Sequence, residues 1–210
     1  MAAPPRPVDR RDTPAGRSRG TAGISVLELV VVLALTLVGS AIGLSAFRDI
    51  AAERGGREAA RQLMHDLQAI AYAARRSGTT HAARLTTASP PTLEVFVDGN
   101  GNGVRAVDIA GGIDRPTGPP RHAFTQAPAL LAIVRDVPTT DHGGTLAAGS
   151  APVRFGVTPF ISFSAHRTGT SGSIYVAGPT GAQYAIRVLG TTGRLRLLCL
   201  ETRAMVWEGC

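Results

Sequence analysis

The stretch that decides the fold runs from Gly23 to Phe47 and reads GISVLELVVVLALTLVGSAIGLSAF. Its last nineteen residues, Leu29 to Phe47, contain no charged side chain and come close to the roughly 20 apolar residues that cross a bilayer as a helix. Glu28 is the only charged residue in the stretch. An ionised carboxylate at the centre of a membrane helix costs about 2.5 to 3.5 kcal/mol, so Glu28 needs a partner or a place near the helix end.

The residues before this stretch form an arm with few apolar side chains. Met1 to Thr21 is rich in Pro, Arg and Gly, a composition that cannot build a core, and we expect it to be disordered. Because arginines flank the apolar run on its N-terminal side, the positive-inside rule places the arm in the cytoplasm. The sequence thus predicts a single-pass inner-membrane protein with a cytoplasmic N-terminus and a periplasmic head.

The bulk composition allows one globular unit. The chain has 210 residues and a formal net charge of +7, and its basic residues are all arginine because it contains no lysine. Abundant Ala, Gly and Arg are typical of a GC-rich genome, so this balance is weak evidence for a nucleic-acid partner. Cys199 and Cys210 fit one disulfide in an oxidising compartment better than a zinc site, which usually takes four ligands. Two free thiols are the alternative.

Three kinds of targeting signal compete for the apolar stretch. A cleaved secretory signal would end at small residues such as Gly39–Ala41, and a signal anchor would keep the whole run. Neither explains a glycine directly before the run or a carboxylate five residues after that glycine. The order Gly23, apolar residue, serine, two aliphatic residues and Glu28, followed by an uncharged run, resembles the class III signal of type IV pilins and type II secretion pseudopilins.

That resemblance implies roles in processing and assembly. A prepilin peptidase would cut after Gly23 and methylate the new amine of Ile24. Glu28 would then pair with the positively charged N-terminus of a neighbouring subunit, which neutralises both buried groups and sets the axial stagger of the filament. The alternative is a glutamate tolerated at the membrane interface.

Beyond the apolar stretch, the hydrophobic residues follow a helical period. Four of them recur at spacings of three and four and predict a helix with one buried stripe: Leu63, Leu67, Ile70 and Ala74. Gly55–Gly56 is expected to bend or loosen this helix, and Gly78 to end it in a left-handed conformation. The run from Leu63 to Gly78 is similar to the GspH/FimT branch of minor pseudopilins.

The remainder of the chain indicates strands and turns. The expected strands are 81–87, 92–97, 104–109, 130–135, 153–155, 160–164, 173–177, 183–189, 194–200 and 205–207. The segment from Gly111 to Pro128 is expected to be a long loop. We therefore predict an α+β, pilin-like fold in which a long N-terminal helix, half transmembrane and half amphipathic, packs on a mostly antiparallel β head.

Four segments follow from this prediction. They are a leader removed by prepilin peptidase (1–23), a transmembrane or filament-core helix (24–47), an amphipathic helix (48–78) and a periplasmic β-rich head (79–210).

A run of Asp, Asn and Gly in the head has the form of half a calcium loop. Asp98, Asn100 and Asn102 place oxygen ligands at alternate positions, and a glycine follows at the sixth. The twelfth position, where calcium loops carry a bidentate glutamate, is Ile109. Because Asp-Gly and Asn-Gly are ordinary hairpin chemistry, the pattern favours a plain turn over bound calcium, and we expect no cofactor.

Arginines near the C-terminus form the second candidate site. Gly193-Arg194-Leu195-Arg196 resembles a Gly-Arg-x-Arg pattern of the GspH/FimT branch, and in some FimT-like members such arginines are implicated in DNA binding during natural transformation. Strand alternation places Arg194 and Arg196 on one face, where Arg187 could join them against phosphates. A solvated strand face is favoured, because no aromatic residue alternates with the arginines to stack bases.

The function implied by the resemblance is that of a minor pseudopilin or minor pilin, a non-enzymatic subunit of a type II secretion or type IV pilus machine. Its partners would be other pilins or pseudopilins, the prepilin peptidase and the inner membrane. A FimT-like DNA-binding subunit and a signal-anchored periplasmic β-domain are the alternatives. The five histidines are scattered without metal spacing and no nucleophile elbow occurs, so no catalytic residue is assigned.

Overall fold

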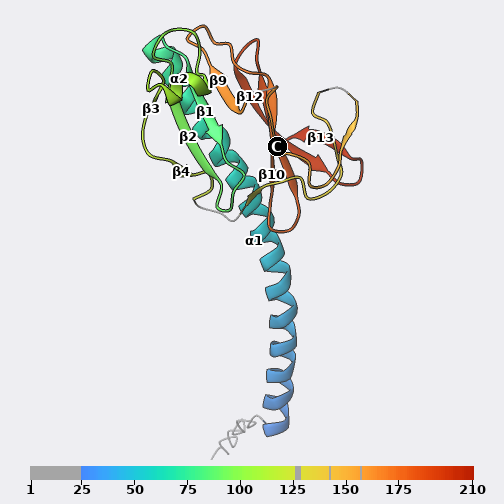
Figure 1. The fold of residues 1–210 in the computed structure, drawn as a ribbon. Helices are drawn as coiled ribbons and strands as arrows, with labels where there is room; N and C mark the ends of the chain where they lie inside the picture. The colour runs from blue at the N-terminus through green and yellow to red at the C-terminus, as the bar shows by residue number, and fades with distance from the viewer. Residues whose placement is uncertain (1–24, 126–128, 142, 157) are drawn as a thin grey trace, which may run out of the picture. The chain divides into compact units, whose positions relative to one another are not determined.

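The computed structural model describes residues 25–125, 129–141, 143–156 and 158–210, with the backbone alone for residues 41–53. Contacts divide the chain into two units, Met1–Leu44 and Ser45–Cys210, which are described separately below. Figure 1 shows the fold.

Most described elements are β-strands. The helices are α1 (Val26–Ser77) and α2 (Ala106–Ala110). The strands are β1 (His81–Leu85), β2 (Thr92–Val97), β3 (Arg115–Pro116), β4 (Arg121–His122), β5 (Leu130–Leu131), β6 (Val137–Pro138), β7 (Thr145–Leu146), β8 (Val153–Arg154), β9 (Phe160–Phe163), β10 (Gly172–Ala177), β11 (Gln183–Leu189), β12 (Arg194–Glu201) and β13 (Val206–Gly209).

Within the second unit, α1 presents one apolar stripe to the core. The four residues predicted from their spacing are all buried, which confirms the stripe: Leu63, Leu67, Ile70 and Ala74. Gly78 follows the last helical residue with a φ of 73°, and its N–H donates to the Ala74 carbonyl, so the predicted glycine end of the helix is also confirmed.

Gly56 has a different role from the predicted bend. The helix continues through it, and a Cβ placed on Gly56 would lie 2.7 Å from the Cα of Gly178. The glycine therefore lets the backbone of α1 approach the turn after β10.

The first sheet has the strand order β3-β2-β1-β9, with β4 also paired to β2, and its pairs are antiparallel. On one face, Ala83, Leu93 and Phe163 join the core cluster that contains α1. On the other face, Phe96 and Phe160 pack with Val104 and the half-buried Ile109 of α2.

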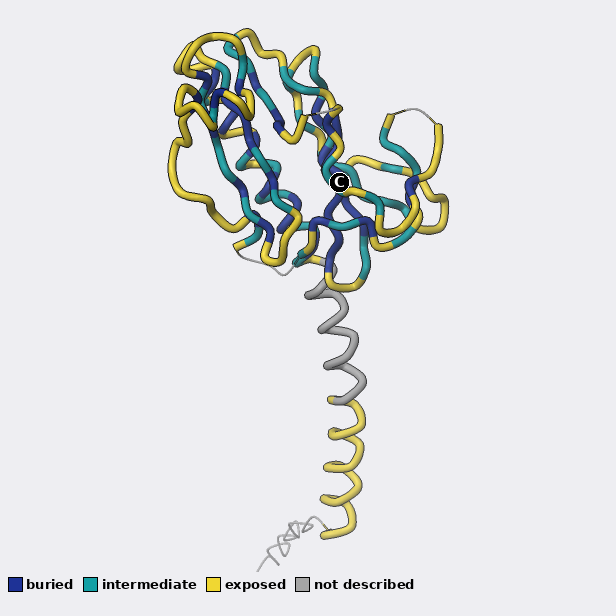
Figure 2. Tube along the Cα trace, in the orientation of Figure 1, coloured by how far each residue is buried: buried dark blue, intermediate teal, exposed yellow. Residues whose placement is uncertain are grey.

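The second sheet has the order β13-β12-β11-β10-β5, with β8 also paired to β10. Every residue of β10 is buried, as expected for a central strand. Ile174 and Ile186 belong to the same core cluster as the buried residues of α1, so α1 shares one core with side chains from both sheets. The opposite face carries Tyr175 and Ala185, which pack against Ile133 and residues of the two-stranded β6-β7 sheet. Within the second unit, Figure 2 shows the buried residues mainly on strands and on α1, and the exposed ones mainly in the connections.

The predicted fold class is wrong as stated. The described chain is mostly antiparallel β-sheet, and no helix within the described residues is long and apolar enough to cross a membrane. A helix with a transmembrane half is therefore not supported.

The same finding overturns the predicted localisation, a single-pass inner-membrane protein with a cytoplasmic N-terminus and a periplasmic head. A local prediction of secondary structure is also wrong. Residues 104–109 were expected to form a strand, whereas Ala106–Ala110 is the short helix α2.

Candidate functional site

The processing residues predicted from the sequence, Gly23 and Ile24, lie outside the described residues. The cut site and the methylated amine therefore stay predictions.

Glu28 lies in the first turn of α1, and its side chain is exposed. The hydroxyl oxygen of Ser25 accepts a hydrogen bond from the Leu27 N–H at 3.3 Å, and the Ser25 carbonyl accepts one from the Leu29 N–H at 3.0 Å. Ser25 thus caps the helix, with Glu28 three residues later in the order Ser-x-x-Glu of a capping box. A carboxylate at this position also interacts favourably with the positive end of the helix dipole. This local role is present in the sequence pattern, but the family resemblance alone did not suggest it.

The first unit exposes a continuous apolar helix surface. All described residues from 26 to 40 are exposed. Ten large apolar side chains between Val26 and Val38 have exposed fractions from 48% to 80%. We call this set the apolar helix surface. Monomeric soluble proteins rarely expose contiguous apolar patches of this kind, which mark association surfaces instead.

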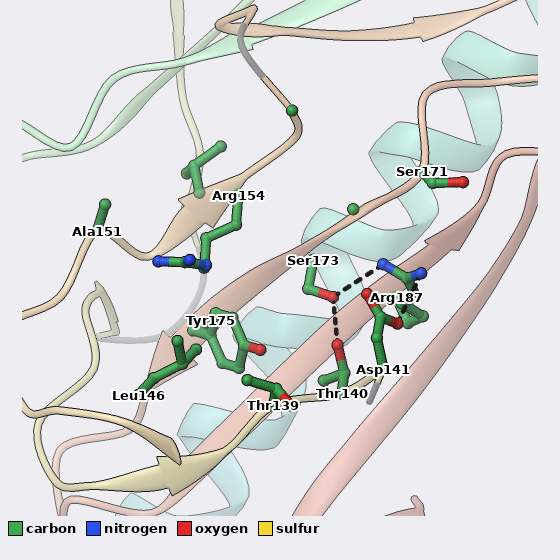
Figure 3. Close-up of a pocket in the computed structure, with 13 residues that line it drawn as sticks. Thr139, Thr140, Asp141, Leu146, Ala151, Arg154, Ser171, Ser173, Tyr175 and Arg187 are labelled. Carbon is green, nitrogen blue, oxygen red and sulfur yellow. Dashed lines mark hydrogen bonds and ion pairs between the residues drawn. The ribbon is translucent and has the colours of Figure 1, made fainter. Parts of the chain in front are cut away.

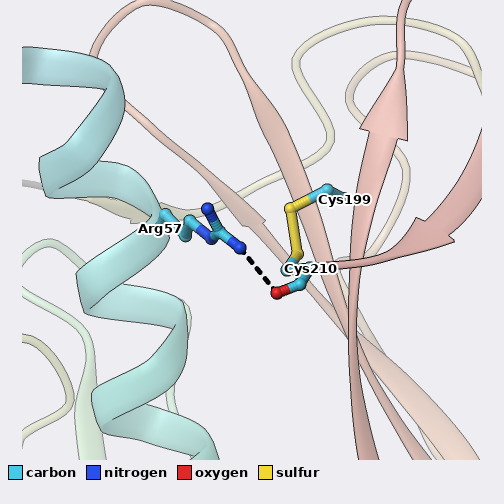
Figure 4. The surroundings of a disulfide bond; sticks show 3 residues. All are labelled: Arg57, Cys199 and Cys210. Carbon is cyan, nitrogen blue, oxygen red and sulfur yellow. Dashed lines mark hydrogen bonds between the residues drawn. A yellow bond between two sulfur atoms is a disulfide. The ribbon is translucent and has the colours of Figure 1, made fainter. Parts of the chain in front are cut away.

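Cys199 and Cys210 form a disulfide with a Cα–Cα distance of 5.4 Å. The bond joins the middle of β12 to the residue after β13. It also holds the Cys210 carbonyl next to α1, where the carbonyl accepts a hydrogen bond from Arg57 Nη2 at 2.5 Å (Figure 4). The disulfide therefore joins β12 to Cys210, and the charged hydrogen bond joins Cys210 to Arg57 of α1.

The run from Asp98 to Gly103 is a turn closed by its own carboxylate. Asp98 is 6% exposed, and its two oxygens accept hydrogen bonds from the N–H groups of Asn100, Gly101 and Gly103. The Asn100 side-chain oxygen accepts one from the Asn102 N–H. These oxygens accept hydrogen bonds from backbone N–H groups, as in an ordinary turn, and the preference for a plain turn over bound calcium stays a prediction.

A second buried carboxylate, missed in the sequence, completes this region. Asp114 is 1% exposed, and its oxygens accept hydrogen bonds from the N–H groups of Gly99 and Arg105. Among the described residues, no group of three or more His, Cys, Asp and Glu side chains could hold a metal ion. The acidic residues here order the loop between β2 and α2.

The three C-terminal arginines do not share one environment. Arg194 and Arg196 are exposed on β12. Arg187, on β11, has a side chain only 15% exposed, and its Nη2 atom pairs with Asp141 Oδ1 at 2.6 Å. Arg187 is therefore engaged within the chain, and the pair Arg194 and Arg196 is the exposed part of the predicted nucleic-acid surface.

Strand register adds an arginine that the sequence did not single out. Ser173 on β10 lies opposite both Arg154 on β8 and Arg187 on β11, and Arg187 lies opposite Arg196 on β12. Directly opposite residues of neighbouring strands project to the same face. Arg154, Ser173, Arg187 and Arg196 thus form a row across four strands, which no pattern in the separate strand sequences could reveal.

Comparisons of the chain with protein-family models, with curated proteins and with solved structures find no match. The GspH/FimT resemblance therefore stays a prediction made from the sequence.

Proposed function

We propose that this chain is a filament subunit of the type IV pilin class, acting as a minor pseudopilin or minor pilin in a type II secretion or type IV pilus machine. The observation that carries the proposal is the apolar helix surface, which begins at Val26 in the same capped first turn that contains Glu28. The order of Gly23, Ile24 and Glu28 in the sequence supports the same class.

Assembly follows from the chemistry of this segment. Transfer of a Val or Leu side chain from water to an apolar contact contributes about 1.5 to 3 kcal/mol when burial is complete. Ten partly exposed side chains therefore provide a strong tendency for the helices of several copies to pack together. Cleavage after Gly23 frees the amine of Ile24, and the Glu28 carboxylate of a neighbouring copy compensates its charge.

The experiment separates the charge of Glu28 from its place in the capping box. Glu28→Gln keeps a residue type that capping boxes accept, whereas Glu28→Ala removes both the cap partner and the charge. We expect both variants to be cleaved at Gly23, as read by intact mass and N-terminal sequencing, and both to be lost from filaments isolated with the partner pilins.

A matched control and two outcomes define the test. Glu58→Gln alters a glutamate of the same helix that is exposed in the second unit, and it should assemble normally. Normal assembly of Glu28→Gln with failure of Glu28→Ala would assign Glu28 to helix capping alone. A mature N-terminus elsewhere than Ile24 would contradict the pilin class itself.

A second candidate function, DNA binding, is favoured by one observation, the exposure of Arg194 and Arg196 on the same strand face. Two phosphate contacts would give an affinity that falls with salt and does not depend on base sequence. The test is the Arg194→Ala, Arg196→Ala double variant, for which oligonucleotide affinity should fall and its salt dependence should weaken. Unchanged affinity would remove this candidate.

A further inference from the structure

A polar cleft lies on the face of the second sheet that carries the arginine row. Its volume is about 620 Å³, and its lining comes from β8, β10, β11 and the segment after β6. The charged side chains in it are Arg154, Arg187 and Asp141, and hydroxyl groups from Ser173 and Thr139 stand beside them (Figure 3). We call it the arginine cleft.

Arg187 is held in place within this cleft. Ser173 is 3% exposed, and its hydroxyl lies 3.4 Å from Arg187 Nη1 and 2.6 Å from the hydroxyl of Thr140. Asp141 Oδ1 lies 2.6 Å from Arg187 Nη2, and the Asp141 side chain is 44% exposed. A guanidinium fixed by a buried hydroxyl and facing a half-exposed carboxylate is preorganised for carboxylate recognition.

The rest of the cleft has unused binding capacity. Arg154 is exposed and forms no ion pair among the described residues. It lies two strands from Arg187, which corresponds to about 10 Å. The Thr139 hydroxyl is buried and has no hydrogen-bond partner in the described structure. Two cations, an orphaned hydroxyl and one internal carboxylate thus line a cleft with a net positive charge.

We propose that the arginine cleft binds an acidic segment of a partner protein, and that Asp141 is an internal stand-in which this segment displaces. Asp141 lies in the segment between β6 and β7, and its carboxylate already pairs with Arg187 as the carboxylate of a bound aspartate would. In an extended peptide, a second carboxylate two residues further along lies about 7 Å from the first. With the first carboxylate on Arg187, the second is directed towards Arg154. This inference goes beyond the filament role and does not depend on it.

The cleft favours acidic peptide over single-stranded nucleic acid. Single-stranded nucleic acid is usually held in part by base stacking on an exposed aromatic ring, and the aromatic residue of the lining, Tyr175, is only 2% exposed. Carboxylates, by contrast, need guanidinium groups but no aromatic ring, and Arg187 and Arg154 supply two such groups.

The test uses the full chain and a fluorescein-labelled octapeptide of alternating aspartate and glycine, with binding measured by fluorescence anisotropy at low salt. Arg187→Gln should weaken binding at least about tenfold, because it removes a half-buried, hydrogen-bonded cation. Arg154→Gln should weaken it about two- to fivefold, as expected for an exposed charge. Asp141→Asn should strengthen binding about two- to fivefold, since the internal competitor is lost.

The gain expected for Asp141→Asn cannot be produced by misfolding, so it keeps the test decisive if Arg187→Gln folds poorly. Arg115→Gln, an exposed arginine on the first sheet, is the matched control and should leave binding unchanged. An equal loss in Arg115→Gln, or no gain in Asp141→Asn, would overturn the proposal. So would an octathymidylate that binds with the same sensitivity to Arg154 and Arg187 while the acidic peptide does not bind.

Discussion

Removal of the disulfide gives a prediction whose size follows from the structure. Cys199 and Cys210 are 11 residues apart, and closing a loop of that length lowers the entropy of the unfolded chain. The chain-entropy relation gives about 2.8 kcal/mol at 25 °C for this loop. We expect the Cys199→Ser, Cys210→Ser double variant to lose about that much unfolding free energy.

The hydrogen bond from Arg57 to the Cys210 carbonyl makes a second, coupled contribution. Arg57 is half-buried, so its charged hydrogen bond is expected to contribute about 1.5 to 3 kcal/mol. If the disulfide positions that carbonyl, Arg57→Met should cost less in the cysteine-free background than in the native one. A double-mutant cycle therefore measures whether the covalent bond and the hydrogen bond act as a unit.

The assay is urea denaturation, monitored by the fluorescence of Trp207, the only tryptophan in the chain. Trp207 lies inside the closed loop, and its Nε1–H donates to the Pro138 carbonyl at 2.7 Å, so it reports on the packing of β13. Reduction of the native protein should shift the midpoint as far as the double substitution does. A loss below about 1 kcal/mol, or equal effects of Arg57→Met in both backgrounds, would refute this reasoning.

Three further predictions concern the packing of the second unit. Leu67→Ala should lower the unfolding free energy by about 2 to 5 kcal/mol because Leu67 is fully buried, whereas Tyr72→Ala, on the exposed side of α1, should change it by less than about 0.5 kcal/mol in the same urea titration. Gly56→Ala should cost about 1 to 3 kcal/mol, since its Cβ would meet Gly178, and a more stable variant in thermal unfolding would disprove that contact. Asp98→Ala should lower the melting temperature equally with and without added calcium, because its carboxylate binds backbone N–H groups; calcium stabilisation confined to the native protein would instead reveal a metal site.

Local patterns predicted those elements whose partners lie close in the sequence. The helix stripe through Leu67 follows from a period of 3.6 residues, and the glycine end at Gly78 from a conformation that glycine adopts most easily. The strands 183–189 and 194–200 were expected almost at the observed bounds of β11 and β12, because alternating apolar residues flank a tight turn.

The short helix α2 shows where such patterns fail. Residues 104–109 look like a strand, yet a strand would turn Val104 and Ile109 to opposite faces because they are an odd number of residues apart. In the structure both pack with Phe96 and Phe160, and a helical turn at Ala106–Ala110 makes this arrangement accessible. The helical conformation of this segment is therefore favoured by packing against a face of the first sheet, which a local sequence pattern does not show.

Segments without a hydrophobic pattern gave a similar outcome. β3 and β4 lie in the stretch expected to be a long loop, and their residues are exposed. They pair with β2 through backbone hydrogen bonds, which carry almost no side-chain signal. The apolar run at the N-terminus gave the opposite error, because its hydropathy suggested a membrane span that the described helix does not support.

By itself, the sequence determined the elements and chemistry that nearest neighbours decide: the stripe and end of α1, the turn closed by Asp98, and the capping order of Ser25 and Glu28. Only the tertiary structure decided which charges meet. The register of β8, β10 and β11 brings Arg154 and Arg187 to one cleft, where Arg187 pairs with Asp141 from the segment between β6 and β7. Register depends on the pairing of whole strands and on the packing of both sheet faces, so a side chain's neighbours across a sheet are a property of the fold rather than of any local pattern.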